Sequence, residues 1–199
     1  MQPKTATDLQ AVTVGPLQPL NGKIVLSEYD PAWPQAFAAE AANIRRVLGN
    51  RVRVLEHVGS TSVPGLAAKP VIDIVLAVDN AADETAYVPD METAGYVLRI
   101  REPEWYEHRV FKGPAANINL HVFSTGCPEV ARMILFRDRL RTHAADRERY
   151  ANAKRELAER DWAFVQNYAD AKTQVVEEIV ARAAGHEQQG GTESAAPTD

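Results

Sequence analysis

The sequence predicts an α+β fold in which a mixed sheet is flanked by helices, with a helical C-terminal third. Runs typical of strands lie in the first two thirds of the chain, and helical patterns dominate the last third. The run Val71–Val78 is nearly all apolar, as in a central strand covered on both faces. With 199 residues, 45% of them hydrophobic and 25% charged, the chain has the composition of a globular protein with one sizeable core.

We expect one folded domain over residues 23–185. Residues 1–22 are rich in Thr, Gln, Pro and Gly and show weak periodicity, so they are expected to form a flexible N-terminal arm. Residues 186–199 are small and polar, which is typical of a disordered tail.

The first elements of the domain follow from short local signals. Ile24–Leu26 is an apolar run that predicts a short strand. Asp30 and Pro31 predict the start of a helix, because Asp accepts hydrogen bonds from free N–H groups and Pro in the first turn loses none. Apolar side chains then recur at helical spacing up to Gly49, a C-cap, and these are Trp33, Phe37, Ile44 and Leu48.

The next elements alternate between strand and helix patterns. Val52–Val58 alternates as a strand does, and a short loop joins it to Val71–Val78, so we expect the two to be neighbours in one sheet. A helical stretch broken by Pro89 follows. From Pro128 the chain is helical, and two charged amphipathic helices continue it to about residue 184. Between these helical regions three further strands are predicted, over Tyr96–Ile100, Tyr106–Lys112 and Asn117–Ser124.

Charge and cysteine content exclude several classes of protein. The net charge of −5 argues against a basic footprint for duplex nucleic acid or for a membrane surface. The single cysteine, Cys127, excludes an intrachain disulfide and a thiolate zinc cluster, so we expect a reducing, cytoplasmic location. No basic-then-apolar leader pattern is present, and no apolar run approaches the ~20 residues that cross a bilayer.

The most informative stretch is Glu56–Ile74, where polar residues interrupt two strand patterns. Gly59 lets a backbone approach an anionic ligand closely, and the hydroxyl and N–H groups of Ser60 and Thr61 can hold phosphate oxygens. Asp73 lies in an apolar run, so its carboxylate must be paired, bound to metal or exposed at an opening. The alternative is that Ser60 and Thr61 cap a turn and that Asp73 accepts backbone N–H groups.

Other side chains are candidates for the same site. His121 alternates with apolar neighbours, so it points to the opposite face, where it can transfer protons near neutral pH or bond to a carbonyl. Lys69 is the only cation in its loop and can neutralise a phosphate. Arg137 and Arg141 lie four apart on a helix and can clamp a phosphate or carboxylate, unless they form a solvated charged face. We expect one concave site to be lined by Ser60, Thr61, Asp73 and His121.

The run Glu56–Ile74 resembles the signature of the GrpB-like family. Further segments match the same family, and these are Tyr29–Pro34, Asn119–Phe123, Phe136–Arg141, and Tyr150 with Lys154. The resemblance covers residues 24–184 and implies a fold similar to that of nucleotidyltransferases. In some bacteria a similar domain is fused to dephospho-coenzyme A kinase.

The resemblance also implies roles for particular residues. Nucleotidyltransferases place Gly-Ser at the end of one strand and an acid-x-acid pair on the next, and the pair holds divalent metal ions that bridge nucleotide phosphates. Gly59, Ser60 and Asp73 match this pattern, but Val75 stands where the second acid would be. We therefore expect weak or absent binding of a Mg²⁺ pair, with Asp73 as the residue that a Mg²⁺ or Mn²⁺ ion would meet. Either His121, Glu56 or His57 completes a different site, or this chemistry has been lost.

Two functions follow as expectations. In the first, the protein binds a nucleotide or another phosphorylated small molecule and acts as a nucleotidyl- or phosphoryltransferase. Its catalytic residues would be Asp73 and His121, and its phosphate-binding residues would be Gly59, Ser60, Thr61, Lys69, Arg137 and Arg141. In the second, it is a non-catalytic accessory or folding-helper domain related to the one fused to dephospho-coenzyme A kinase. The polar residues around Gly59 favour the first function, and the missing second acid favours the second.

Overall fold

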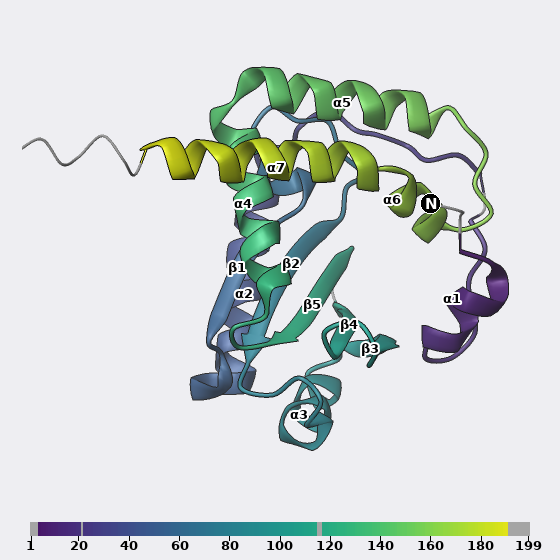
Figure 1. Cartoon of the computed structure of the whole chain (residues 1–199). Coiled ribbons are helices and arrows are strands. Elements are labelled where there is room, and N and C mark those ends of the chain that lie inside the picture. Colours follow the sequence, from purple (N-terminus) through teal and green to yellow (C-terminus); the bar gives the residue numbers. More distant parts are fainter. Residues whose placement is uncertain (1–3, 21, 115–116, 191–199) are drawn as a thin grey trace, which may run out of the picture.

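A five-stranded mixed sheet lies at the centre of the protein and is flanked by helices, which confirms the predicted α+β class (Figure 1). The computed structural model describes residues 4–20, 22–114 and 117–190. The sheet order is β1-β2-β5-β4-β3, and only the pairing of β2 with β5 is parallel. The strands are β1 (Val54–Val58), β2 (Ile72–Val78), β3 (Val97–Glu102), β4 (His108–Lys112) and β5 (Ile118–Ser124).

β2 is central because its apolar run is covered on both faces. From Ile74 to Val78 every residue is buried. β1 pairs antiparallel with β2, with Val58 opposite Asp73, so the predicted adjacency of these two segments is confirmed. β4 begins two residues later than predicted, because Tyr106 and Glu107 both have φ of 54° and belong to the turn after β3.

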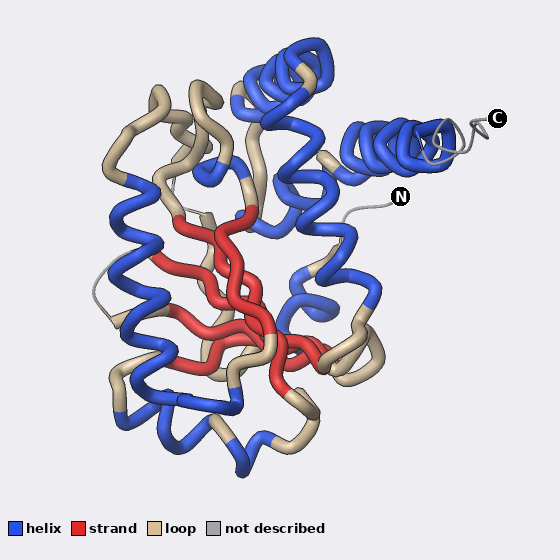
Figure 2. The backbone as a smooth tube through the Cα atoms, turned by 90° about the vertical axis from the view of Figure 1, so that its left-hand side faces the viewer, coloured by secondary structure: helices blue, strands red, loops and turns tan. Residues whose placement is uncertain are grey.

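Helices cover the two faces of the sheet (Figure 2). On one face, α2 (Trp33–Leu48) and α3 (Val88–Thr93) bury a large core around Ile74 and Leu76. On the other face, α4 (Pro128–Thr142) packs over a smaller cluster that includes Val75 and Phe123. Short 3-10 turns complete the sheet connections, and they are η1 (Gly49–Arg51), η2 (Ser60–Ser62) and η3 (Glu84–Ala86).

α2 ends at the predicted glycine but begins two residues later than predicted, with Ala32 rather than Asp30 as its N-cap and with Pro31 before the helix. The carboxylate of Asp30 accepts a hydrogen bond from the N–H of Ala32 at 2.8 Å, and the first helical residue is Trp33. Pro34 lies in the first turn, where its missing N–H removes no helical hydrogen bond. Gly49 ends the helix with φ of 56°, a conformation that glycine adopts without a steric penalty.

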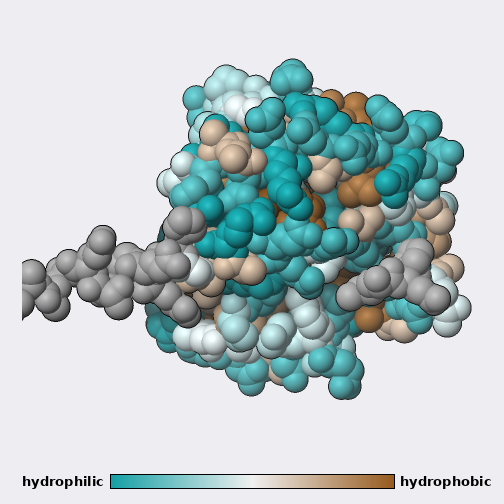
Figure 3. Space-filling model, turned by 45° about the horizontal axis from the view of Figure 1, so that its top comes forward, coloured by the Kyte–Doolittle hydropathy of each residue, from teal (hydrophilic) through white to brown (hydrophobic). Residues whose placement is uncertain are grey.

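The C-terminal third contains one more helix than predicted. After α4 come α5 (Ala144–Ala158), α6 (Val165–Ala171) and α7 (Thr173–Gly190). Leu140, Tyr150 and Ile179 pack together and join α4, α5 and α7. The face that carries α5 and α7 is mostly hydrophilic, as expected of charged outer helix surfaces (Figure 3).

Three further segments differ from the sequence prediction. Within residues 1–22, α1 (Ala6–Val12) begins with a capping box between Thr5 and Asp8. The apolar run Ile24–Leu26 forms no strand, and Ile24 packs instead against side chains of the α5–α6 region. Helix α7 includes residues 186–190 of the predicted tail, and residues 191–199 lie outside the described residues.

Candidate functional site

Three polar side chains share one face of the sheet where β2 meets β5. The parallel register places Asp73 opposite Asn119 and Val75 opposite His121, so Asp73, Asn119 and His121 point the same way. The amide of Asn119 donates to Asp73 Oδ1 at 2.7 Å, and Nε2 of His121 lies 3.8 Å from the same oxygen. The side chains of Asp73 and His121 are 28% and 22% exposed. Their predicted placement on one side of the sheet is confirmed, and their roles stay predictions.

Gly59 closes the end of β1 directly over Asp73. Its φ is +69°, and a Cβ built on it would lie 2.5 Å from Asp73 Oδ2. Glycine is therefore needed here both for the backbone conformation and for the close approach of the carboxylate. From the sequence, Gly59 was predicted to let a ligand approach the backbone. The close contact with Asp73, across the loop between β1 and β2, explains the glycine without a ligand.

Three lysines interact electrostatically with this carboxylate. Nζ of Lys112 donates to Asn119 Oδ1 at 2.5 Å. Burial lowers the pKa of Lys69, and the nearby charges of Lys172 and Lys112 lower it further, while Asp73 opposes this change. Burial works to raise the pKa of Asp73, but His121, Asn119 and Lys172 outweigh it and hold that pKa below its usual value. We call Asp73, Asn119, His121, Lys69, Lys112 and Lys172 the Asp73 patch.

Two further titratable groups extend the patch across the sheet. Nδ1 of His121 lies 3.1 Å from Nε2 of His108, and Nδ1 of His108 lies 2.8 Å from the carboxylate of Glu102. His108 is 4% exposed. Neither residue was predicted as part of the site, because the only sequence signal was a histidine within a predicted strand. The register that joins it to Glu102 and His121 is a tertiary property.

The hydroxyl of Thr61 points inward, in agreement with the alternative that it is satisfied within its turn. It donates to the carbonyl of Val71 at 3.0 Å and lies 3.1 Å from Nε2 of His57, and Thr61 is 1% exposed. The predicted contact between this hydroxyl and a phosphate is therefore wrong. Ser60, by contrast, is partly exposed.

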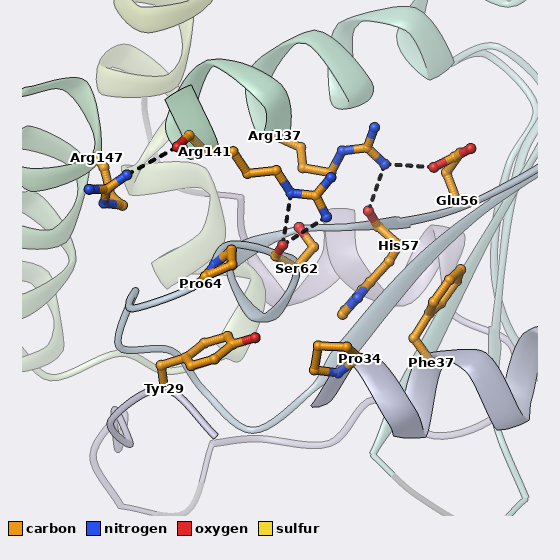
Figure 4. A pocket seen from close by; sticks show the side chains of 10 residues that line it. All are labelled: Tyr29, Pro34, Phe37, Glu56, His57, Ser62, Pro64, Arg137, Arg141 and Arg147. Carbon is orange, nitrogen blue, oxygen red and sulfur yellow. Dashed lines mark hydrogen bonds and ion pairs between the residues drawn. The ribbon is translucent and has the colours of Figure 1, made fainter. Parts of the chain in front are cut away.

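The two arginines of α4 that were predicted to bind phosphate, Arg137 and Arg141, bind protein acceptors rather than meeting Asp73. Nη1 of Arg137 donates to Glu56 at 2.7 Å and to the carbonyl of His57 at 3.0 Å, while its Nε donates to Asp138. Nε and Nη2 of Arg141 both donate to the carbonyl of Ser62, at 3.0 and 2.9 Å (Figure 4). Both guanidinium groups thus fasten α4 to β1 and η2, and the predicted phosphate clamp does not form with the Asp73 patch.

A cavity of about 590 Å³ lies beside these arginines, at the β1 edge of the sheet. Pro34 and Phe37 of α2 face the arginines across it (Figure 4). Phe37 stacks on the ring of His57 at 4.8 Å, and burial, followed by the charge of Arg141, lowers the pKa of His57 to about 4. The lining residues are Tyr29, Pro34, Phe37, Glu56, His57, Ser62, Pro64, Arg137, Arg141 and Arg147. None of the four residues predicted to line one concave site, Ser60, Thr61, Asp73 and His121, lines this cavity. Of these four, Asp73 and His121 meet instead at the Asp73 patch.

Replacing Arg137 with alanine is expected to lower the free energy of unfolding by about 1.5–3 kcal/mol, because it removes charged hydrogen bonds from the buried carbonyl of His57. Urea denaturation measures this change. Arg132→Ala is the control, since Arg132 lies on the same helix but pairs with Glu129 while 38% of its side chain is exposed. Equal losses in the two variants would contradict the fastening role of Arg137.

The donors at the Asp73 patch do not fit a pair of divalent ions. Val75 contributes no oxygen, and Asp73 Oδ1 already accepts from Asn119. Over residues 4–20, 22–114 and 117–190 there is no group of three or more His, Cys, Asp or Glu side chains that could hold a metal ion. The arrangement of two ions between paired acids therefore does not suit these side chains.

The fold and site together define an α+β protein whose mixed sheet carries a carboxylate, an imidazole and lysines on one partly exposed face. The model of the GrpB protein family matches residues 23–182, and the chain belongs to this family. A UPF0157 protein of Halalkalibacterium halodurans is 61% identical over 181 residues, which are 91% of this chain and 93% of that protein.

Two further proteins extend this assignment. The crystal structure of the conserved protein GrpB from Enterococcus faecalis aligns with a TM-score of 0.72 and 29% identity, over 82% of this chain and 99% of that chain. A protein named dephospho-CoA kinase from Mycolicibacterium paratuberculosis is 27% identical over 72% of this chain and 42% of its own length. None of the helices within the described residues is long and apolar enough to cross a membrane.

Proposed function

We propose that the protein binds a nucleotide or another phosphorylated small molecule at the Asp73 patch and that His121 accepts a proton there during phosphoryl or nucleotidyl transfer. One observation carries the proposal. A carboxylate whose pKa is held below its usual value lies on an apolar strand, partly exposed, with an imidazole nitrogen 3.8 Å away and three lysines that interact with it electrostatically. Paired polar groups of this kind on an otherwise apolar surface favour a binding role.

The charge balance of the patch suits a phosphate. Lys69, Lys112 and Lys172 outnumber the one carboxylate of Asp73. A lysine acts on phosphate as a point charge. Unlike the planar guanidinium of arginine, it needs no particular orientation to neutralise the phosphate oxygens. The charge of Lys172 lowers the pKa of Asp73, and Asp73 in turn works to raise the pKa of Lys69, which supports a shared electrostatic environment for these groups.

The proposed reaction follows from the side chains of the patch. Nε2 of His121 takes the proton of an attacking hydroxyl, whose oxygen then forms a bond to phosphorus. The bond from phosphorus to the leaving oxygen breaks, and the leaving group keeps the electron pair. Asp73 stabilises the imidazolium that forms, and the lysines stabilise charge on the phosphoryl oxygens. The free thiol at Cys127 fits the reducing cytoplasm, and phosphorylated ligands of this kind are cytoplasmic.

The second candidate function is a non-catalytic accessory or folding-helper domain. Val75 in place of the second acid supports it, as does the relative named dephospho-CoA kinase, which this chain matches over less than half of that protein's length. In this case the Asp73 patch would bind a ligand without transforming it, or bind none.

Lysine substitutions are expected to separate these functions. In calorimetric titrations with ribonucleoside triphosphates, pyrophosphate and coenzyme A precursors, we expect at least one probe to bind, and Lys69→Ala and Lys112→Ala each to weaken it by about tenfold to hundredfold. Lys23→Ala is the matched control, because Lys23 is exposed and pairs with Asp161. His121→Gln should keep binding within a few fold and abolish turnover.

Two results would count against the proposal. Binding that survives both lysine substitutions would place the ligand elsewhere, for example in the cavity of Figure 4. Binding at the patch without turnover of any probe would favour the accessory function. Titrations repeated with and without Mg²⁺ should agree, since the donor set does not fit a metal pair.

A further inference from the structure

We infer that His108 and Glu102 are positioning residues that hold His121 as the tautomer protonated on Nδ1, so that its Nε2 is the free base on the Asp73 patch. The catalytic use of that base rests on the proposed function, but the tautomer itself is a property of the free protein. Its structural basis is a row of four side chains that crosses four strands.

The sheet register builds this row. Asp73 lies on β2, His121 on β5, His108 on β4 and Glu102 on β3, and Glu102 is directly opposite His108. The distances between neighbouring groups are 3.8 Å from Asp73 to His121, 3.1 Å from His121 to His108 and 2.8 Å from His108 to Glu102. The last two are hydrogen bonds, and the first is longer than one.

Proton placement follows from the Glu102 end of the row. Burial works to raise the pKa of Glu102, but the hydrogen bond with His108 outweighs it, so this carboxylate is ionised and can only accept. Nδ1 of His108 must therefore carry the proton of that bond. Burial lowers the pKa of His108 to about 4 although the hydrogen bond with Glu102 opposes this change, so near pH 7 its Nε2 is an acceptor.

The acceptor on His108 decides the state of His121. A neutral imidazole has one N–H, and His121 stands between two acceptors, His108 Nε2 and Asp73 Oδ1. The shorter contact is with His108, which draws the proton to Nδ1 of His121. Without His108, the carboxylate of Asp73 would draw the proton to Nε2 and remove the base. His108 and Glu102 thus counteract the attraction of Asp73 for the proton of His121. Asp73 pairs with the His121 ring only when that ring gains a second proton.

Aromatic packing keeps the row in place. The ring of His108 stacks on Phe123 at 4.6 Å, with 14° between the planes, and meets the edge of Trp105 at 5.0 Å. The rings of His108 and His121 are within 5° of parallel. These contacts pack two aromatic side chains against His108 and restrict the rotation of its ring. The other charged groups near the row are Lys4 beside Glu102, Arg109 beside His108, and Lys69, Lys112 and Lys172 around Asp73.

Nitrogen-15 NMR of the histidine rings tests the inference in the free protein near pH 7.5. Long-range proton–nitrogen spectra, assigned with His121→Gln, should show His121 protonated on Nδ1 and bare on Nε2. In His108→Phe, which keeps an aromatic ring against Phe123, the proton should move to Nε2. A wild-type His121 protonated on Nε2, or a tautomer unchanged in His108→Phe, would overturn the inference.

Further variants guard against a trivial loss of structure. His108→Gln offers an oxygen that can accept from His121 and should restore the wild-type tautomer in part. Glu102→Leu should free His108 to reverse its tautomer and so move the proton of His121 to Nε2, and an unchanged His121 would contradict the row. Glu107→Gln is the control for this substitution, because Glu107 lies in the neighbouring turn, where its carboxylate and its carbonyl both face Arg109.

The readout is independent of the proposed function. If no phosphorylated probe binds while His121 keeps its Nδ1 proton, the proposed function fails and the tautomer assignment stands. If a probe is turned over, His108→Phe should lower kcat by about tenfold to hundredfold with KM nearly unchanged, since the base is lost but the lysines are intact. Equal kcat values would show that the tautomer has no catalytic use.

Discussion

Replacing Gly59 with alanine is expected to lower the free energy of unfolding by roughly 2–5 kcal/mol, the sum of a left-handed backbone and an overpacked contact. Gly59 has φ of +69°, and the added Cβ would meet Asp73 Oδ2 at 2.5 Å and Asp73 Cβ at 3.0 Å. The carboxylate cannot simply swing away, because Asn119 holds its other oxygen at 2.7 Å. Denaturant unfolding measures the loss, and ligand titration should show the Asp73 patch disturbed in parallel.

A second glycine separates the two causes. Gly65 has φ of +76° and nothing within 4 Å of its added Cβ, so Gly65→Ala should cost only the backbone strain of about 1–2 kcal/mol. The excess in Gly59→Ala is then the contact with Asp73. Asp73→Ala in the same chain should recover part of that excess, since it removes Oδ2. Equal costs for the two glycine variants would argue against the close approach.

Lys154 should make stability depend strongly on pH in alkaline solution. It is 1% exposed on α5, its Nζ donates to the carbonyl of Ala67, and it lies 5.0 Å from the centre of the Tyr150 ring. Burial lowers its pKa from 10.5 to about 7, and Lys172 and Arg155 add to this effect. Between these two values the unfolded chain binds the proton that the folded protein has lost, so stability rises with pH over that window.

The expected slope is up to about 1.4 kcal/mol per pH unit from pH 7 to 10, or about 4 kcal/mol in all. The contribution of Lys154 to this slope should disappear in Lys154→Met, whose side chain does not titrate, and persist in Lys23→Met, where the lysine side chain is 60% exposed. Urea unfolding at several pH values gives the three curves. Parallel curves for wild type and Lys154→Met would show that the buried amine titrates normally.

Local patterns predicted much of the fold. The apolar run of β2 and the alternation in β1 and β5 are readable in sequence because a strand has a period of two. The same period placed His121 on the face opposite its apolar neighbours, where the structure has it beside Asp73. The capping box of α1, between Thr5 and Asp8, is also a local signal, and a search for it would have predicted that helix.

Local sequence patterns did not predict which charged side chains form hydrogen bonds with distant segments of the protein. Lys154 looks like part of a solvated helix face, yet it is buried against a loop carbonyl 87 residues away. Arg137 looks like one half of a phosphate clamp, yet it bonds to Glu56, 81 residues away. A charged residue on a helix has the same local pattern whether its face meets water or another segment.

The sequence by itself determined where most strands and helices form, which face each strand residue takes, and that Asp73 needs a special environment. Only the tertiary structure decided the partners, that is, which cations surround Asp73 and which acceptor orients His121. The reason is physical. Periodicity is set by neighbours along the chain, whereas the row from Asp73 to Glu102 depends on the registers of three strand pairs, and a slip of one residue in any of them would turn its side chains to the other face.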